Sequence, residues 1–145
     1  MLDTTKFDGM KVLQFAFDGD PNNAYLPHNH IKNCVLYTGT HDNDTLMGWL
    51  KNASHDSVSQ AKAYINCKND ADFNWDMIKF ALSSVADTCI IPMADLLGLD
   101  SQGRINTPST VGSNWQWRIK GECINGWLAE ILNTNTALYG RAAKK

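Results

Sequence analysis

The chain has 145 residues, of which 43% are hydrophobic and 10% aromatic, and its formal net charge is −2 at pH 7. A chain of this size and composition can bury a core, which argues against an intrinsically disordered protein. Lysine and arginine are scattered, so the basic stripe of a nucleic-acid-binding protein is absent. No apolar stretch approaches the roughly 20 residues that span a bilayer. We therefore expect neither a nucleic-acid nor a membrane partner.

Three short runs rich in β-branched and aromatic residues predict strands. They are Lys11 to Phe17, Cys34 to Thr38 and Thr88 to Pro92. A polar segment follows each run, and these segments are residues 18–20, 40–43 and 95–115. The last contains the whole of a long polar connection, residues 98–115, and a connection of that length inside a compact domain is usually functional.

Apolar residues recur at helical spacing between and after these runs. Asp44 or Asn43 is expected to cap a short helix through Trp49, with Thr45 at its start, and residues 57–67 predict another helix. A third helix carries Phe73, Met77, Ile78, Ala81, Leu82 and Val85. A fourth carries Cys123, Ile124, Trp127, Leu128, Ile131 and Leu132.

The four cysteines, at positions 34, 67, 89 and 123, are widely spaced and form no Cys-x-x-Cys pair. This spacing is typical of reduced cysteines in a core rather than of a disulfide framework. The N-terminal residues also lack the pattern of a secretory leader. We therefore expect a cytoplasmic protein.

Strands that alternate with helices predict an α/β fold built from parallel β/α units. Ligands bind at the carboxyl ends of the strands in such folds, which is where residues 40–43 lie. However, three parallel strands leave two bare edges, and an eight-stranded barrel takes about 250 residues. The pattern thus predicts either a small open sheet or a piece of a larger fold.

Four ordered blocks carry a specific resemblance: GMKVLQFAFDGDPNNAYLPHN, VLYTGTHDNDTLMGW, IIPMADLLGLDSQGRINTPSTVGSNWQWR and LYGR. Together they resemble the bacterial 4-alpha-glucanotransferases, also called amylomaltases or disproportionating enzymes, from about Phe7 to Arg141. The departures are small. Asp8, Ser113 and Gln116 stand where the family usually has Pro, Gly and Arg.

The resemblance implies a (β/α)8 TIM-type barrel, of which residues 1–145 would be the C-terminal portion with about three β/α units. The implied reaction is a retaining transfer of α-1,4-glucan segments between maltooligosaccharides, with no metal or organic cofactor. The family's nucleophilic aspartate and acid/base glutamate belong to earlier strands. The missing N-terminal barrel portion of the same enzyme would therefore be an essential partner, and the isolated chain is expected to be inactive.

By the same resemblance, Asp42 matches the family's third essential carboxylate, which holds hydroxyls of the reacting sugar and favours its developing positive charge. His41 matches a histidine that donates to the same sugar. Asn114 and Trp115 lie on the long polar connection, and amide and aromatic groups suit sugar hydroxyls and C–H faces. We expect Asp42 to be catalytic and the other three residues to bind substrate.

Simpler structural roles stay open for these residues when the sequence pattern is considered alone. Asp42 could cap a helix, His41 could be a structural histidine, and Trp115 could anchor its loop to the core. A different function is a non-catalytic α-glucan-binding or interaction module. A metal hydrolase using His41-Asp42 with His28 and His30 is disfavoured, because such ligands lie on helices in that class while His41 and Asp42 follow a strand.

Overall fold

A computed structural model describes residues 7–143 of the chain. Its centre is a three-stranded sheet in the order β1-β2-β3, formed by Gly9–Val12, Cys34–Tyr37 and Thr88–Ile90. Both strand pairs are parallel, with Met10 opposite Val35 and Leu36 opposite Cys89. The prediction of an α/β fold with parallel strands is confirmed.

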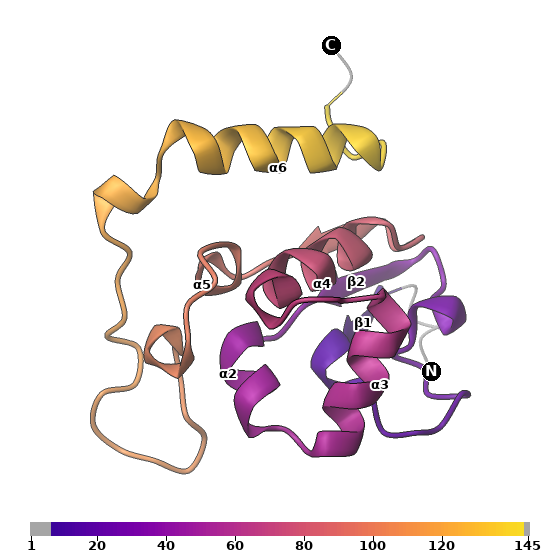
Figure 1. The fold of residues 1–145 in the computed structure, drawn as a ribbon, viewed down its shortest axis with the longest axis horizontal. Coiled ribbons are helices and arrows are strands. Elements are labelled where there is room, and N and C mark those ends of the chain that lie inside the picture. The colour runs from indigo at the N-terminus through magenta and orange to yellow at the C-terminus, as the bar shows by residue number, and fades with distance from the viewer. Residues whose placement is uncertain (1–6, 144–145) are drawn as a thin grey trace.

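Five α-helices are found in the described residues: α2 (Leu46–Asn52), α3 (His55–Ile65), α4 (Phe73–Leu82), α5 (Met93–Leu96) and α6 (Gly126–Leu138). Helix α4 is central, because α2, α3 and α5 each pack against it. Figure 1 shows α6 as the long helix at the top of the view, joined to α5 by a largely extended connection. None of the helices in residues 7–143 is long and apolar enough to cross a membrane.

The first strand is shorter than the sequence predicts. Residues Leu13–Phe15 form a 3-10 turn, and Leu13 and Gln14 are both buried, which the alternation of a half-buried strand would not allow. The turn lets the Gln14 side chain donate to the backbone oxygen of Asp44 at 2.7 Å. The end of β1 is thereby tied to the loop that follows β2.

The capping prediction for α2 was wrong, because Thr45 is the N-cap. Its side chain accepts a hydrogen bond from the backbone N–H of Gly48 at 3.0 Å. The side chain of Asp44 instead accepts from the N–H of Thr45 at 2.8 Å, and that of Asn43 accepts from the N–H of Thr40 at 2.9 Å. The side chains of Asn43, Asp44 and Thr45 therefore each accept a hydrogen bond from a different backbone N–H group.

The boundaries of α3 and α6 also differ from the prediction, and capping explains both differences. Ser54 caps α3, which therefore begins at His55, two residues before the predicted start. Asn125 caps α6 by accepting from the N–H of Leu128, so Cys123, expected inside the helix, precedes it. Ser and Asn are favoured at these positions because their side chains satisfy free N–H groups of the first turn.

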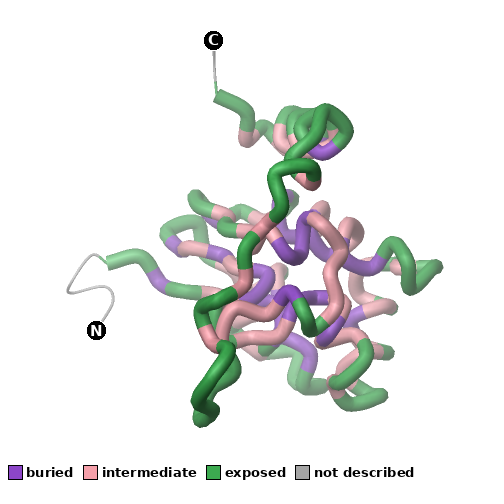
Figure 2. The backbone as a smooth tube through the Cα atoms, turned by 90° about the vertical axis from the view of Figure 1, so that its left-hand side faces the viewer, coloured by how far each residue is buried: buried purple, intermediate pink, exposed green. Residues whose placement is uncertain are grey.

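The core lies between the sheet and the helices around α4. Its fully buried side chains include Val12, Leu13, Leu26, Leu36, Leu46, Phe73, Met77 and Ile78. Phe73 stacks on Trp49 of α2, with ring centroids 6.0 Å apart and an interplanar angle of 11°. Figure 2 shows the buried residues concentrated in this body, whereas α6 and its connection are mostly exposed.

All four cysteines are free, as predicted, but only Cys34 is buried in the core, and Cys67, Cys89 and Cys123 are partly exposed. Burial raises the pKa of the Cys89 thiol to about 11, so this cysteine is a poor nucleophile at neutral pH.

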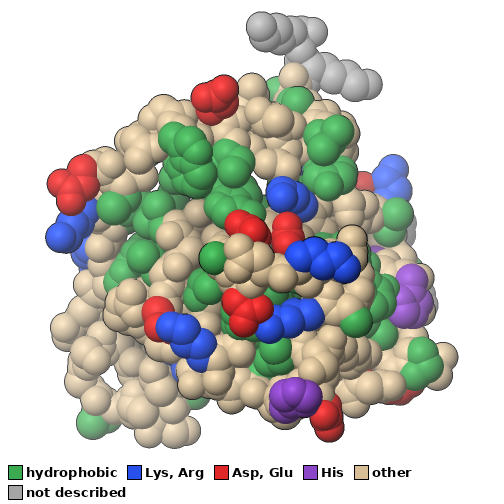
Figure 3. Space-filling view, viewed as in Figure 1, with side chains coloured by type: hydrophobic (Ala, Val, Ile, Leu, Met, Phe, Trp, Pro, Cys, Tyr) green, Lys and Arg blue, Asp and Glu red, His purple; other side chains and the backbone are tan. Residues whose placement is uncertain are grey.

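Charged side chains of both signs are interspersed on the face seen in Figure 3, without a large patch of one sign. This matches the nearly balanced charge of the sequence.

Candidate functional site

His41 and Asp42 lie on the loop that follows the carboxyl end of β2. The turn is closed by a bond from the N–H of Asn43 to the oxygen of Thr40 at 3.2 Å, and the Thr40 hydroxyl accepts from the N–H of Asp42 at 3.3 Å. His41 Nε2 lies 3.3 Å from Asp42 Oδ1, and the two side chains are 54% and 50% exposed. The turn thus holds an imidazole and a carboxylate side by side at the surface.

The long connection after α5 returns to this loop and holds Asp42. Asn106 donates from Nδ2 to Asp42 Oδ1 at 2.6 Å, and Arg104 donates to the backbone oxygen of Asp42 at 2.7 Å. Arg104 also donates from Nε to the backbone oxygen of Asn106 at 2.8 Å. Within the described part of the chain, Asp42 Oδ2 makes no hydrogen bond. One carboxylate oxygen is therefore fixed while the other is available to a ligand.

Trp115 lies beside His41, with ring centroids 5.2 Å apart at an angle of 36°. Trp115 is 56% exposed, so it does not anchor its loop in the core. Its backbone is left-handed, with φ of 66°, and its N–H donates to the oxygen of Ile105 at 2.8 Å. Such a conformation costs a non-glycine residue about 1–3 kcal/mol and is concentrated at functional sites.

Asn114 precedes Trp115 but turns its carboxamide into its own loop. Its Oδ1 accepts from the N–H of Thr107 at 2.9 Å, and its Nδ2 donates to the oxygen and hydroxyl of Thr110, both at 3.1 Å. Asn114 therefore shapes the loop that presents Trp115. Its direct contact with substrate stays a prediction.

Asp95, in α5, is a second carboxylate near this loop, and it is only 2% exposed. It accepts from the Thr38 hydroxyl at 2.6 Å and from the backbone N–H of Leu46 at 2.8 Å. Burial raises the pKa of Asp95 to about 6, although these two hydrogen bonds act in the opposite direction. In the sequence, Asp95 is the first residue of the polar segment after the third predicted strand, and no local pattern indicates a role for it.

Arg104 and Asn106 were not predicted as site residues, although both belong to the block IIPMADLLGLDSQGRINTPSTVGSNWQWR that resembles the family. A cleft of about 20 Å³ separates the β2–α2 loop from this segment. Its lining residues are Thr40, Asn43, Asp44, Thr45, Pro92, Ala94, Asp95, Gly103, Arg104 and Ile105. That volume accommodates little more than one water molecule, so a larger ligand would have to lie outside this cleft.

The sequence model of the 4-alpha-glucanotransferase family, glycoside hydrolase family 77, matches residues 1–124. The chain belongs to the 4-alpha-glucanotransferase family. The resemblance inferred from the sequence blocks is thereby confirmed.

Two relatives show how much of the family's length the chain represents. It is 48% identical over 138 residues to the 4-alpha-glucanotransferase of Clostridium butyricum and 46% identical over 140 residues to that of Synechocystis sp.. These matches cover 94% and 96% of the chain but 28% of each relative. The chain thus spans less than a third of the relatives it matches.

A solved structure, the amylomaltase from Streptococcus agalactiae in complex with acarbose, has the same fold over this region. The TM-score is 0.93 at 34% identity, and the match covers 98% of this chain and 29% of that one. The arrangement of β1, β2, β3 and the helices is therefore shared with an amylomaltase.

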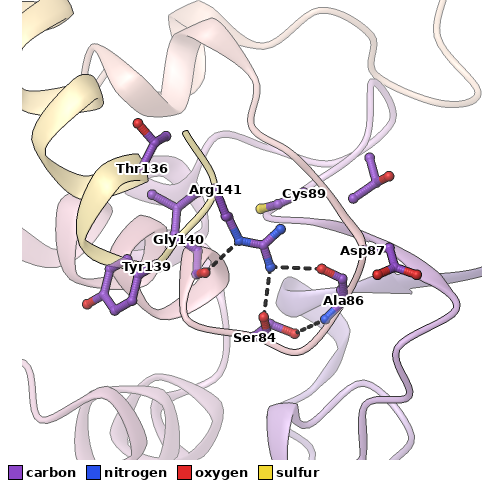
Figure 4. A pocket seen from close by; sticks show the side chains of 10 residues that line it. Ser84, Ala86, Asp87, Cys89, Thr136, Tyr139, Gly140 and Arg141 are labelled. Carbon is purple, nitrogen blue, oxygen red and sulfur yellow. Dashed lines mark hydrogen bonds between the residues drawn. The ribbon is translucent and has the colours of Figure 1, made fainter. Parts of the chain in front are cut away.

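The chain has a larger hollow of about 520 Å³ near the start of β3, at the opposite end of that strand from the His41 loop. Figure 4 shows Arg141 reaching into it. The guanidinium donates to the backbone oxygens of Leu82 and Ser84, both at 2.7 Å, and of Ala86 at 2.8 Å. Arg141 therefore fastens the segment after α6 to the end of α4, which is a structural role.

His28 and His30, considered above as metal ligands, make hydrogen bonds through both ring nitrogens. His28 contacts the Tyr64 hydroxyl at 2.5 Å and the oxygen of Pro21 at 2.8 Å. His30 contacts the Ser84 hydroxyl and the oxygen of Tyr25, both at 2.8 Å. Burial lowers the pKa of His30 more than any other influence does, and the neutral ring is therefore favoured. Both histidines therefore have structural partners.

Proposed function

We propose that this chain supplies part of the sugar-binding surface of a 4-alpha-glucanotransferase, a retaining transglycosylase that moves α-1,4-glucan segments between maltooligosaccharides. The observation that carries the proposal is the arrangement of His41, Asp42 and Trp115 around one exposed surface. Asn106 fixes one oxygen of Asp42 and leaves the carboxylate half exposed. Membership of the 4-alpha-glucanotransferase family supports the substrate class.

Asp42 is the catalytic residue of this proposal. Its free oxygen accepts a hydrogen bond from a hydroxyl of the reacting sugar, and its charge stabilises the oxocarbenium-like transition state. The bond from Asn106 supports this role, because a carboxylate held in place before the reaction needs no reorganisation when charge develops. The nucleophile and acid/base would come from another part of the enzyme.

His41, Trp115 and Asn114 form the proposed substrate-binding group. The imidazole of His41 is exposed beside Asp42 and donates to the same sugar. The exposed ring of Trp115 offers an apolar face to the C–H groups of a glucose unit. Asn114 contributes by holding the loop that carries Trp115.

We further propose that residues 1–145 are the C-terminal portion, about three β/α units, of a (β/α)8 barrel. The match to 28% of each relative and the parallel sheet both support this. Partly exposed apolar side chains on the outer strands, Met10 at 56% and Ile90 at 43%, fit a surface that packs against the remaining barrel. The N-terminal barrel portion is thus the proposed partner.

The proposed chemistry requires no metal or organic cofactor, because carboxylates carry nucleophilic and acid/base catalysis in retaining transfer. A cytoplasmic location is proposed on a separate basis. The four free cysteines are typical of a protein in a reducing compartment.

The proposal is tested by comparing this chain alone with a chimera in which it replaces the region it matches in the Clostridium butyricum relative. The isolated chain is expected to release no detectable glucose from maltotriose, because the covalent step needs the absent nucleophile. The chimera is expected to release glucose and form longer maltooligosaccharides. Product analysis by chromatography gives both readouts, with the unmodified relative as the control.

Two outcomes would contradict the proposal. The first is release of glucose from maltotriose by the purified isolated chain. The second is a chimera that unfolds at the same temperature as the unmodified relative but transfers no glucan. Tight binding of maltooligosaccharides by this chain together with an inactive chimera would favour a non-catalytic α-glucan-binding module instead.

A further inference from the structure

One buried carboxylate is bonded to both ends of the loop that carries His41 and Asp42. Asp95 Oδ2 accepts from the Thr38 hydroxyl at 2.6 Å, and Oδ1 accepts from the backbone N–H of Leu46 at 2.8 Å. Thr38 directly follows β2, and Leu46 is the first residue of α2. The two hydrogen bonds therefore bracket residues 39–45.

Asp95 is itself fixed to the core. The side chain of Asn74 on α4 donates to the backbone oxygen of Asp95 at 2.8 Å, and Asn74 is only 4% exposed. The charged residues that line the same cleft are Asp44 and Arg104. Helix α4 thus holds α5, and Asp95 on α5 holds the ends of the loop.

We propose that Asp95 is a positioning residue for Asp42: it fixes the separation between the ends of the loop and so directs His41 and Asp42 toward the sugar. The inference rests on the proposed function, since contact between Asp42 and the sugar is itself proposed. Both bonds require acceptor oxygens, and the Leu46 N–H is a first-turn donor without a partner inside its helix. An asparagine would supply only one acceptor oxygen and no charge, so the Thr38 hydroxyl and the Leu46 N–H could no longer each donate to a carboxylate oxygen.

The charge state of Asp95 provides a readout that simple loss of packing would not change. Burial raises its pKa to about 6, the bonds from Thr38 and Leu46 lower it, and the charge of Asp44 raises it further. Below that pH the carboxyl is protonated and accepts these bonds less well. If Asp95 holds the loop, signals from residues 40–44 should follow its titration.

The test uses NMR amide spectra of the 145-residue chain, recorded over about pH 4 to 8. In His41→Gln, which removes the imidazole from the probed loop, the amides of Leu46 and of residues 40–44 are expected to shift together with a midpoint of about 6. Asp95→Asn should abolish this common transition. Asp87→Asn, which removes an exposed carboxylate 3.9 Å from Lys32, should leave it unchanged.

A second pair of variants keeps the test decisive if Asp95→Asn does not fold. Thr38→Val removes the hydroxyl with little change in shape and should speed amide hydrogen exchange in residues 40–44 about tenfold, whereas Thr38→Ser should restore the original rate. Two results would overturn the inference. One is an unchanged rate of amide hydrogen exchange in residues 40–44 of folded Thr38→Val, and the other is amide signals of these residues that do not change when Asp95 titrates. No sugar is present in these measurements, so their failure is distinct from failure of the proposed function.

Discussion

Replacement of Asp42 by asparagine is expected to lower kcat for glucan transfer by about 10²–10³-fold in the chimera with the Clostridium butyricum relative. The asparagine oxygen can still accept the bond from Asn106, so the loop should keep its conformation. What is lost is the negative charge that we propose faces the sugar in the transition state. Steady-state glucose release from maltotriose, resolved into kcat and KM, measures the effect.

Asp87→Asn is the matched control for this prediction. It makes the same chemical change at an exposed carboxylate beside the start of β3, where the only described ion-pair partner is Lys32. Its kcat should equal that of the unmodified chimera, and both variants should unfold at the same temperature as that chimera. A folded Asp42→Asn chimera with unchanged kcat would remove Asp42 from the catalytic group.

Replacement of Phe73 by alanine is expected to lower the free energy of unfolding by about 3–5 kcal/mol. The ring is fully buried and stacks on Trp49, so its removal leaves a cavity between α4 and α2. Urea denaturation of this chain, followed by circular dichroism, measures the loss. Helix α2 begins where the His41–Asp42 loop ends, so the same change should also loosen that loop.

Phe7→Ala is the control for the Phe73 variant. It removes the same ring from a position that is 74% exposed, and its effect should stay within about 0.5 kcal/mol. Equal losses from the two variants would show that the α2–α4 contact is not an important part of the core.

The sequence predicts much of the fold because its strongest signals are local. The strand after Asn33 and the apolar face of α4 were predicted to within a few residues. The prediction of a strand from Lys11 to Phe17 was wrong after Val12. Apolar character indicates burial but does not distinguish a buried strand from a buried turn, and residues 13–15 form a 3-10 turn. The cap of α2 was misplaced because Asn43, Asp44 and Thr45 are all good capping residues.

The predicted residues that lie together in the structure are the adjacent pair His41 and Asp42 and, beside His41, Trp115 of the long polar connection. His41 and Asp42 are adjacent, and the resemblance to 4-alpha-glucanotransferases assigned them together. Asn106 lies 64 positions from Asp42, and Asp95 lies 57 positions from Thr38. No local periodicity encodes such pairings, so the residues that hold the loop became visible only in the folded chain.

A crystal structure of the chimera with acarbose tests the central claim most directly. We expect a carboxylate oxygen of Asp42 to lie about 2.5–3.2 Å from a sugar hydroxyl, with His41 and Trp115 against the same part of the ligand. Asn106 should keep its bond to the other oxygen of Asp42. Acarbose bound in the chimera without contact to either Asp42 or His41 would contradict the account.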